Sequence, residues 1–290
     1  MEQDLTEWLF KTKAIKIAPA DKPFWYTSGT LGPIYINTHY LYGGEEKAVH
    51  LLNIIDGGVG GKDKDGINRL EFHRKLNKEI LNNYNEDDIF HSLINKMTSY
   101  ITEKMDIDGI DYISGGERRD WFFSMPVAKL LNKRHITIFK DLSMVIYGND
   151  EIHNAGDLKG AKILHVADLV TEASSYERAW IPAIKSANGR IASSLSVIDR
   201  DQGGFEVLRK NNIDPHSLCK INFELFVKAA ELGCLDDMQY AIIKEYLKDP
   251  DGAMKKFINE NPDFINNAVN GNNKKDSERA KLCVQKGFYT

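Results

Sequence analysis

The sequence contains little cysteine and no long apolar run, and each shortage excludes a class of protein. The three cysteines among its 290 residues lie in the last third of the chain, at Cys219, Cys234 and Cys283. Their spacing matches no zinc-ligand pattern, and their odd number argues against a disulfide framework. No stretch approaches the ~18 apolar residues of a membrane-spanning helix, and residues 1–13 lack the apolar segment of a secretory signal peptide. We therefore expect a cytoplasmic protein with no membrane partner, whose cysteines are reduced and structural.

The chain also lacks an excess of positive charge. Its 38 Lys and Arg residues stand against 42 Asp and Glu residues, which gives a formal net charge of -4. A weakly acidic balance offers no electrostatic attraction to the phosphates of DNA or RNA, so we expect no nucleic-acid partner. The hydrophobic fraction of 42% is enough for one large core or two modest ones in a chain of this length.

The centre of the chain alternates between strand-like and helix-like segments. Apolar runs typical of strands occupy residues 110–113, 136–139, 163–166 and 191–198. Between them, Ser124 is expected to cap a helix that ends at Leu131. A second helix is expected to begin at Ser174 or Ser175 and to end at Gly189. This order predicts an α/β fold with a mostly parallel sheet flanked by helices.

Segments of different composition surround this alternation. A short amphipathic helix at 4–12 precedes two short strands at 24–29 and 32–37, which a turn joins. A Gly- and Asp-rich loop at 56–66 precedes two amphipathic helices, and the end of the chain shows helical patterns alone. The sequence therefore predicts four parts, which are an N-terminal hood at 1–43, a helical insertion at 44–104, the α/β core at 105–205 and a C-terminal helical extension at 206–290.

One stretch of the core combines groups that suit a phosphorylated sugar. The strand at 163–166 leads through Asp168 into a hydroxyl-rich loop with Thr171, Ser174 and Ser175. Open parallel sheets bind ligands at the carboxyl ends of their strands. Hydroxyls and the free N–H groups of a helix start can donate to a phosphate, and the carboxylate can accept from sugar hydroxyls. A helix cap and a turn that bind no ligand are the alternative.

This stretch resembles the phosphoribosyl pyrophosphate (PRPP) motif of the type I phosphoribosyltransferases. The motif is an apolar strand, two acids, two branched apolar residues and then Thr-Thr-Gly-Gly-Ser or a similar run. The matching positions are Asp168 for the second acid, Leu169 and Val170 for the apolar pair, Thr171 for the first Thr and Ser175 for the last hydroxyl. The residues that lead into the strand, 156–162, resemble the family's as well.

Four positions depart from the motif. Ala167 replaces the first acid, which removes an acceptor for a ribose hydroxyl. Glu172 replaces the second Thr, and its carboxylate would repel a phosphate unless it points away. Ala173 and Ser174 replace the two glycines, which in the family let backbone N–H groups close on the phosphate.

Two further segments resemble orotate phosphoribosyltransferase within that family. Residues 197–204 resemble its strand-end motif, in which an Arg binds the carboxylate of the base, and Arg200 holds that place. Residues 14–37 resemble its N-terminal region, which implies substrate contacts for Ser28 and Tyr35. A Lys that helps to hold pyrophosphate in the family is absent before Ser28.

Two arginines near another strand end could replace that lysine. Gly115–Asp120 lies where the family has its pyrophosphate-contacting loop, and it carries Arg118 and Arg119. A surface cluster of salt bridges is the alternative for these two arginines. Lys140 belongs to a strand-end triplet that resembles the family's Arg-Lys-Glu. The family's mobile loop then carries a Lys and a His, and residues 142–148 lack both.

The resemblance implies a transferase that moves ribose 5-phosphate from PRPP to orotate or a related acidic nucleobase and releases pyrophosphate. Mg²⁺ would be the cofactor, and we expect a homodimer. Asp168 and Lys140 would be the catalytic residues, and the substrate-binding residues would be Thr171, Ser174, Ser175, Arg118, Arg119, Arg200, Ser28 and Tyr35. The alternative is a binding protein of the same fold that senses a nucleotide or a phosphorylated sugar without turnover.

Two other patterns are interpreted as structural. Residues 63–72 resemble an EF-hand loop, but with Gly66 at the sixth position Ile67 and Glu71 each fall one residue early, and calcium ligation depends on that register. We therefore expect no metal-ligating residues there. His165 lies inside an apolar strand, which indicates a core histidine rather than a ligand.

Overall fold

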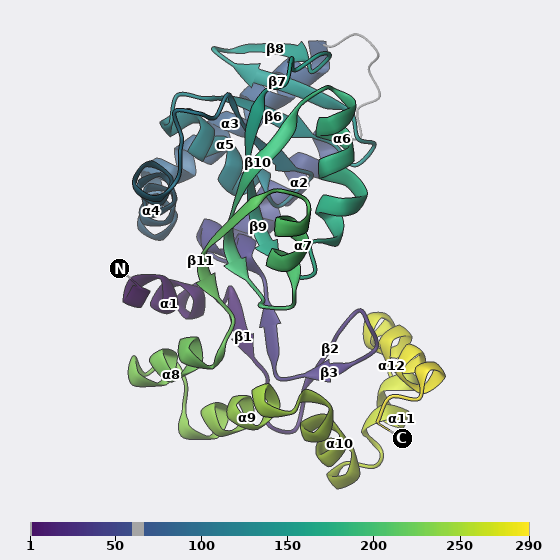
Figure 1. Ribbon diagram of the computed structural model, residues 1–290. Coiled ribbons are helices and arrows are strands. Elements are labelled where there is room, and N and C mark those ends of the chain that lie inside the picture. Colours follow the sequence, from purple (N-terminus) through teal and green to yellow (C-terminus); the bar gives the residue numbers. More distant parts are fainter. Residues whose placement is uncertain (1, 60–66, 290) are drawn as a thin grey trace. The chain divides into compact units, whose positions relative to one another are not determined.

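A computed structural model describes residues 2–59 and 67–289, with side chains from residue 5 and from residue 69 onward in the two stretches (Figure 1). The chain divides into two compact units. Residues 38–221 form the larger unit, and residues 3–37 form the smaller one together with residues 222–290. In the part of the chain that is described, none of the helices is long and apolar enough to cross a membrane.

The larger unit is built on a seven-stranded sheet with the strand order β11-β10-β9-β5-β6-β7-β8. Its strands are β5 (Tyr112–Gly116), β6 (Arg134–Ile138), β7 (Met144–Gly148), β8 (Glu151–Asn154), β9 (Lys162–Val170), β10 (Arg190–Asp199) and β11 (Asp214–Lys220). In this order, the five strands from β11 to β6 are parallel to one another. Strand β7 is antiparallel to β6, and β8 is antiparallel to β7. The predicted α/β fold with a mostly parallel sheet is confirmed.

Helices lie against the sheet in two groups (Figure 1). They are η1 (Thr38–Tyr42), α2 (Glu45–Val59), α3 (Ile67–Glu86), α4 (Asp88–Lys104), α5 (Trp121–Leu130), the π-helical turn η2 (Tyr176–Trp180), α6 (Ile181–Ser186) and α7 (Gly204–Lys210). Helix α5 packs on β5, β6 and β9 and is itself contacted by α3 and α4. Helix α6 packs on β10, and α7 packs on β11.

Helix α5 begins three residues before the predicted cap. Its first turn contains three fully buried aromatic residues, Trp121, Phe122 and Phe123. Packing of this turn against its neighbours removes their apolar surface from water, which stabilises the earlier helix start. Ser124 is therefore inside the helix, and the prediction that it caps the helix is wrong. Its hydroxyl contacts His135 Nε2 at 2.9 Å.

The predicted loop at 56–66 begins too early. Helix α2 continues to Val59 through two glycines, and its buried side chains are Ala48, Leu51, Leu52 and Ile55. These residues recur at helical spacing, so tertiary packing overrides the low helix propensity of glycine. Residues 60–66, which include the first four residues of the EF-hand-like pattern, lie outside the described residues.

Strand β11 corrects the prediction that the chain is only helical after residue 205. Its sequence is mostly polar, and Pro215 is its one fully buried side chain. The strand lies at the edge of the sheet and pairs with β10 alone. An edge strand needs less apolar surface than a central one. Strand β11 therefore lacks the apolar run by which β5, β6, β9 and β10 were predicted.

The smaller unit combines the two ends of the chain. Its strands form two antiparallel pairs, β1 (Ile15–Ile17) with β4 (Ile34–Ile36) and β2 (Phe24–Trp25) with β3 (Leu31–Gly32). Its helices are α1 (Glu2–Lys11), α8 (Phe223–Glu231), α9 (Asp237–Lys248), α10 (Pro250–Glu260), α11 (Phe264–Val269) and α12 (Lys274–Lys286). The predicted helices of the extension thus pack on the N-terminal segment.

Aromatic and backbone contacts join those two ends. The rings of Trp25 and Phe264 stack with centroids 5.8 Å apart. Arg279 donates to the carbonyl oxygen of Trp25 at 2.8 Å, and the Leu31 N–H donates to the Tyr289 hydroxyl at 2.8 Å. These contacts cover a cluster around Trp25 and Leu31 that would otherwise face water.

We expect Phe226→Ala to destabilise the smaller unit by about 3–5 kcal/mol, because Phe226 is fully buried and packs edge-to-face on Phe10. The matched control is Phe223→Ala on the same helix. Phe223 is 41% exposed, so we expect a change of under about 1 kcal/mol. Chemical denaturation followed by circular dichroism measures both. Equal effects of the two substitutions would contradict the described packing of α8.

Candidate functional site

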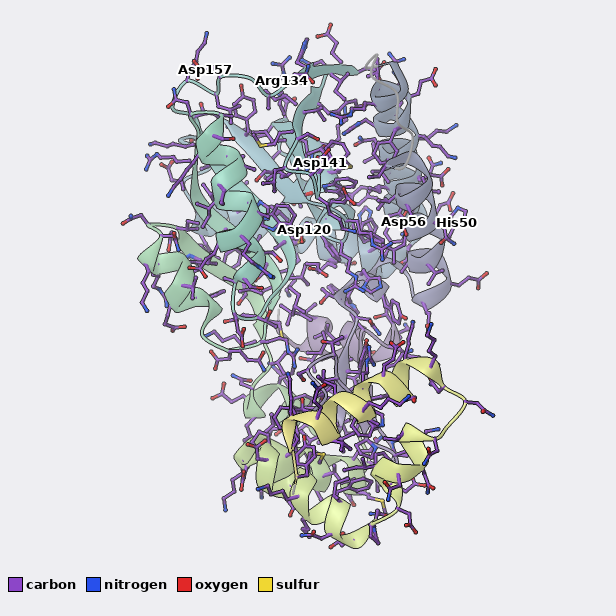
Figure 2. All side chains as sticks on the ribbon, turned by 90° about the vertical axis from the view of Figure 1, so that its right-hand side faces the viewer. His50, Asp56, Asp120, Arg134, Asp141 and Asp157 are labelled. Atoms are coloured by element: carbon purple, nitrogen blue, oxygen red, sulfur yellow. The ribbon has the colours of Figure 1, made fainter. Side chains whose placement is uncertain are left out.

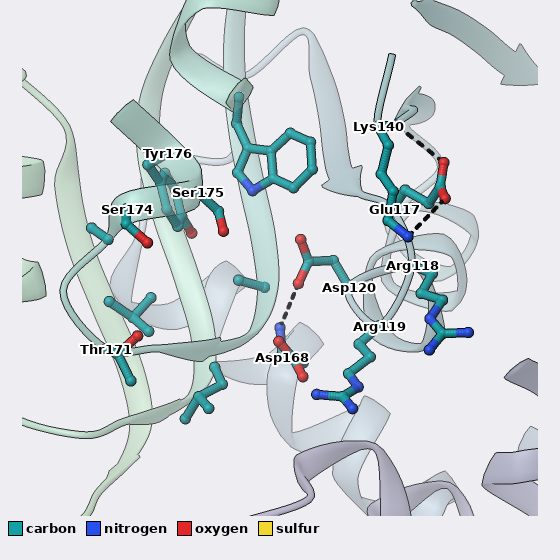
Figure 3. A pocket seen from close by; sticks show the side chains of 15 residues that line it. Glu117, Arg118, Arg119, Asp120, Lys140, Asp168, Thr171, Ser174, Ser175 and Tyr176 are labelled. Carbon is teal, nitrogen blue, oxygen red and sulfur yellow. Dashed lines mark hydrogen bonds and ion pairs between the residues drawn. The ribbon is translucent and has the colours of Figure 1, made fainter. Parts of the chain in front are cut away.

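A cavity of about 290 Å³ opens at the carboxyl ends of β5, β6 and β9 (Figure 3). It is lined by the loop Glu117–Asp120 after β5, by Lys140 after β6, and by residues 167–171 and 173–176 at and beyond the end of β9, together with Trp180. The carboxyl ends of neighbouring parallel strands meet at one edge of a sheet, which is where ligands of open α/β sheets bind. The sequence-predicted residues that line this cavity are Asp168, Lys140, Thr171, Ser174, Ser175, Arg118 and Arg119.

The loop after β9 presents its hydroxyls to the cavity and turns its carboxylate away. Thr171, Ser174 and Ser175 line the cavity, whereas Glu172 is exposed and does not line it. Ala173 adopts a left-handed conformation with φ 55° and is buried. Because Glu172 lies outside the lining, the repulsion that it would exert on a phosphate in the cavity is reduced.

The helix after this loop differs from the predicted one. Ser175 precedes the π-helical turn η2 and makes no side-chain capping bond, so its hydroxyl is available to a ligand. Helix α6 begins only at Ile181 and ends at Ser186 rather than at Gly189. Arg178, which the sequence analysis did not single out, donates to Ser174 Oγ at 3.2 Å. The Ser174 hydroxyl proton is left free to donate.

Asp120 connects the loop after β5 with the end of β9. Its Oδ2 accepts the Gly116 N–H at 3.0 Å, and its Oδ1 accepts the Asp168 N–H at 3.0 Å (Figure 3). Behind it, His165 is fully buried, with Nε2 3.5 Å from Asp120 Oδ2 and Nδ1 2.8 Å from Ser114 Oγ. His165 is thus a core histidine, as predicted, and Asp120 is a site residue that the sequence analysis missed.

Burial raises the pKa of the Asp168 carboxyl above its ordinary value, and the neighbouring Asp120 carboxylate raises it further. The positive charge of Arg119 opposes both effects on this pKa. Asp168 is partly exposed to the cavity, so donors from a ligand could reach its oxygens. A carboxyl with a raised pKa in a cavity is typical of functional sites.

The three cations of the cavity differ in their partners. Arg118 forms an ion pair with Asp56 on α2, which agrees with the salt-bridge alternative for this residue. Lys140 Nζ lies 3.6 Å from Glu117 Oε1, and the backbone N–H of Lys140 donates to Glu117 Oε2 at 3.0 Å. Arg119 is exposed and, within residues 2–59 and 67–289, has no carboxylate within ion-pair distance. It is therefore the cation most available to an anionic ligand.

Three predicted site residues lie elsewhere. Arg200 follows β10, where its N–H donates to the Val170 carbonyl oxygen at 2.9 Å, but its side chain does not line the cavity. Ser28 and Tyr35 belong to the smaller unit. There, the Ser28 hydroxyl contacts Thr30 Oγ1 at 2.6 Å, and the Tyr35 ring packs edge-to-face on Phe24.

The loop that carries Arg200 also contacts the loop after β9. Gly203 has φ 86° and precedes α7, and Gly204 begins that helix. A side-chain carbon at Gly204 would overlap the Thr171 carbonyl oxygen. The glycine therefore allows the two loops to approach each other closely.

Comparison with known proteins gave matches in sequence and in structure, although no protein-family model matches the chain. Orotate phosphoribosyltransferase of Sulfurisphaera tokodaii is 31% identical over 177 residues, which cover 59% of this chain and 83% of the relative. Orotate phosphoribosyltransferase of Saccharolobus solfataricus is 33% identical over 91 residues, which cover 31% of this chain and 46% of the relative.

Two solved structures share the fold. Orotate phosphoribosyltransferase of Francisella tularensis matches with a TM-score of 0.51 at 15% identity, over 83% of this chain and 95% of that one. UMP synthase of Leishmania donovani matches with a TM-score of 0.56 at 16% identity, over 86% of this chain. The match covers 42% of the UMP synthase chain, so this protein spans about two fifths of that relative's length.

We expect Gly204→Ala to destabilise the larger unit by about 1–3 kcal/mol, because the new methyl group overlaps the Thr171 carbonyl oxygen. The matched control is Gly156→Ala. Gly156 has open space around it and no left-handed backbone conformation, so we expect a change within about 0.5 kcal/mol. Urea denaturation compares the two variants. A Gly204→Ala protein as stable as the control would show that the loops are not in contact.

We expect Asp168→Asn to raise stability, increasingly so as the pH rises. The pKa of Asp168 is raised in the folded protein, so the folded state binds more protons than the unfolded state. The stability contributed by that proton is present below the unfolded pKa of about 4 and is lost as the pH rises toward the folded pKa.

The amide has no proton to lose, so its advantage over the carboxyl grows through that pH window and reaches about 1–3 kcal/mol at its upper end. Denaturation of both proteins between pH 4 and about pH 8 measures it. Glu172→Gln, which removes an exposed carboxylate of the same loop, is the control and should show no such trend. A constant difference between Asp168→Asn and wild type would argue against the raised pKa.

Proposed function

Since the chain belongs to the type I phosphoribosyltransferase family and is similar to the orotate phosphoribosyltransferases within it, we propose that it transfers ribose 5-phosphate from PRPP to an acidic nucleobase. Orotate or a related base is the acceptor, and pyrophosphate is released. The observation that carries this proposal is the cavity at the strand ends, which combines the hydroxyl loop, the carboxylate of Asp168 and three cations. PRPP carries the matching groups, which are a 5′-phosphate, two ribose hydroxyls and a pyrophosphate.

The loop after β9 would hold the 5′-phosphate. The hydroxyls of Thr171, Ser174 and Ser175 line the cavity, and hydrogen bonds to a charged phosphate contribute about 1.5–3 kcal/mol each. Glu172 is exposed and lies outside the lining, so it adds little repulsion. The left-handed turn at Ala173 takes the part that a glycine usually plays in such a loop.

Asp168 would accept hydrogen bonds from the ribose hydroxyls, and the cations would face pyrophosphate. Arg119 is the first of these cations because it has no ion pair among the described residues. Arg118 and Lys140 would exchange their contacts with Asp56 and Glu117 for the ligand. Charge on the departing pyrophosphate is then stabilised by groups that are already in place.

The reaction needs positioning and charge stabilisation rather than a covalent intermediate. The bond from the ribose to pyrophosphate breaks as a base nitrogen approaches, and positive charge develops on the ribosyl ring. Held between the hydroxyl loop and the cations, the substrate is oriented for this displacement. Asp168, when ionised, would stabilise the positive ring through its negative charge.

Mg²⁺ is part of this proposal. No group of three or more His, Cys, Asp or Glu side chains that could hold a metal occurs in residues 2–59 and 67–289. Mg²⁺ commonly keeps several waters and binds through one or two carboxylates together with substrate phosphates, so the oxygens of Asp168 fit an ion that arrives with PRPP. When bound, the ion would neutralise charge on the pyrophosphate.

Arg200, Ser28 and Tyr35 remain proposed substrate contacts. A guanidinium binds a carboxylate with two parallel hydrogen bonds, which suits Arg200 to the acid group of orotate. We also propose that the protein acts as a homodimer. The test for Arg200 is substrate choice, since its loss should affect an acidic base more than a neutral one.

A binding protein without turnover is the second candidate, and one observation favours it. Arg118 and Lys140 face carboxylates of their own chain, which leaves Arg119 as the free cation for pyrophosphate among the described residues. Such a site could bind a nucleoside monophosphate or a phosphorylated sugar and yet stabilise a departing pyrophosphate poorly.

One assay separates the candidates. The protein is incubated with PRPP, Mg²⁺ and a panel of bases that includes orotate, and pyrophosphate release is measured. We expect release with orotate, a fall of about 100-fold or more for Asp168→Asn, and a change of less than about twofold for Glu172→Gln. Calorimetric binding of PRPP without release for any base would support the binding protein. No binding of PRPP would overturn both candidates.

A further inference from the structure

A second carboxylate lies beside Asp168 although the sequence motif lacks one. The motif has an acid immediately before the position of Asp168, and here Ala167 takes its place. Asp120, from the loop after β5, lines the cavity together with Ala167 and Asp168. We propose that Asp120 replaces the lost acid and that its carboxylate accepts hydrogen bonds from the hydroxyls of a ribose phosphate. This inference deepens the proposed function and rests on it.

The contacts of Asp120 hold it in place and leave room for a ligand. Two backbone N–H groups, those of Gly116 and Asp168, donate to its two oxygens at 3.0 Å. A carboxylate offers about four acceptor positions, so acceptor capacity remains. The side chain is 11% exposed, and Figure 3 shows its carboxylate directed into the space between Asp168 and the loop after β9. Hydroxyl donors in the cavity can therefore reach it.

Buried residues pack behind Asp120. His165 Nε2 lies 3.5 Å from Oδ2, and the other ring nitrogen of His165 contacts Ser114. The ring also packs edge-to-face on Tyr176 with centroids 4.9 Å apart. Asp120 is thus supported from the strand side and open on the cavity side. A group that is held in this way binds a ligand with little loss of side-chain freedom.

Two neighbouring carboxylates are a cost to the folded protein. Asp120 contributes to the raised pKa of Asp168, which means that the two negative charges repel each other. A ligand with two adjacent hydroxyls relieves this repulsion, because each carboxylate gains a donor. The pair would also provide negative charge near the ribosyl ring, where positive charge develops during transfer. The chemistry of the pair therefore suits the vicinal hydroxyls of ribose.

The test compares two probes that share a phosphate and differ in hydroxyls. Calorimetry measures the binding of ribose 5-phosphate and of inorganic phosphate to wild type and to Asp120→Asn. We expect Asp120→Asn to weaken ribose 5-phosphate binding by about tenfold or more, since a hydrogen bond to a charged group is lost. Binding of inorganic phosphate should change by less than about twofold, because the hydroxyl loop is untouched. A purely structural role of Asp120 would weaken both probes alike.

Relocation of the acid provides the decisive variant. Ala167 lines the cavity and is 2% exposed, so Asp120→Asn combined with Ala167→Asp returns a carboxylate to the family position at the cavity wall. Circular dichroism checks that the double variant is folded before its binding is compared. We expect the double variant to bind ribose 5-phosphate within about threefold of wild type. The control is Asp141→Asn. Asp141 is an acid that does not line the cavity (Figure 2). This variant should bind both probes as wild type does.

The outcomes are distinct. Equal loss of both probes in Asp120→Asn, no loss of ribose 5-phosphate binding, or no recovery in the double variant would each overturn the role of Asp120. If Asp120→Asn does not fold, Asp120→Glu takes its place, since it keeps the charge and displaces it by one methylene. Wild type that binds neither probe would overturn the proposed function and this inference with it.

Discussion

The candidate site depends on one buried carboxylate that accepts two backbone N–H groups from different strands. Asp120 receives the N–H of Gly116 at the end of β5 and that of Asp168 near the end of β9. These two bonds fix the spacing between the loop that carries the cations and the strand that leads to the hydroxyls. They continue, beyond the last paired residues, the parallel pairing of β5 with β9. The distance between Asp168 and the cations that line the cavity follows from that spacing.

The sequence predicts the sheet and much of the site because both have local signals. Apolar runs mark β5, β6, β9 and β10, and the acid and hydroxyls directly follow β9. Asp120 has no such signal. It stands among charged residues, and its bond to Asp168 spans 48 positions, so only the pairing of β5 with β9 reveals its role. Likewise, the polar strand β11 becomes recognisable only beside β10.

In the loop after β9, the backbone conformation changes the effect that a departure from the motif is expected to have on phosphate binding. From its charge alone, Glu172 is an obstacle to phosphate binding. In the folded loop it is exposed, and the left-handed turn at Ala173 separates it from the hydroxyls of Ser174 and Ser175. The direction of a side chain in a turn is set by φ and ψ, which the residue types of this loop do not determine. Departures from a motif are therefore best judged after the turn is known.

The smaller unit has a consequence for the order in which the protein can fold. Its core joins residues 3–37 to residues 222–290, and the bond between Leu31 and Tyr289 links positions 258 apart. During synthesis the first segment must wait for the last before its apolar side chains are covered. Closing so long a loop is entropically costly while the intervening chain is unfolded, and non-local contacts of this kind slow folding. Prior folding of residues 38–221 would shorten the unfolded stretch between the two ends and so lower the entropic cost of closing the smaller unit.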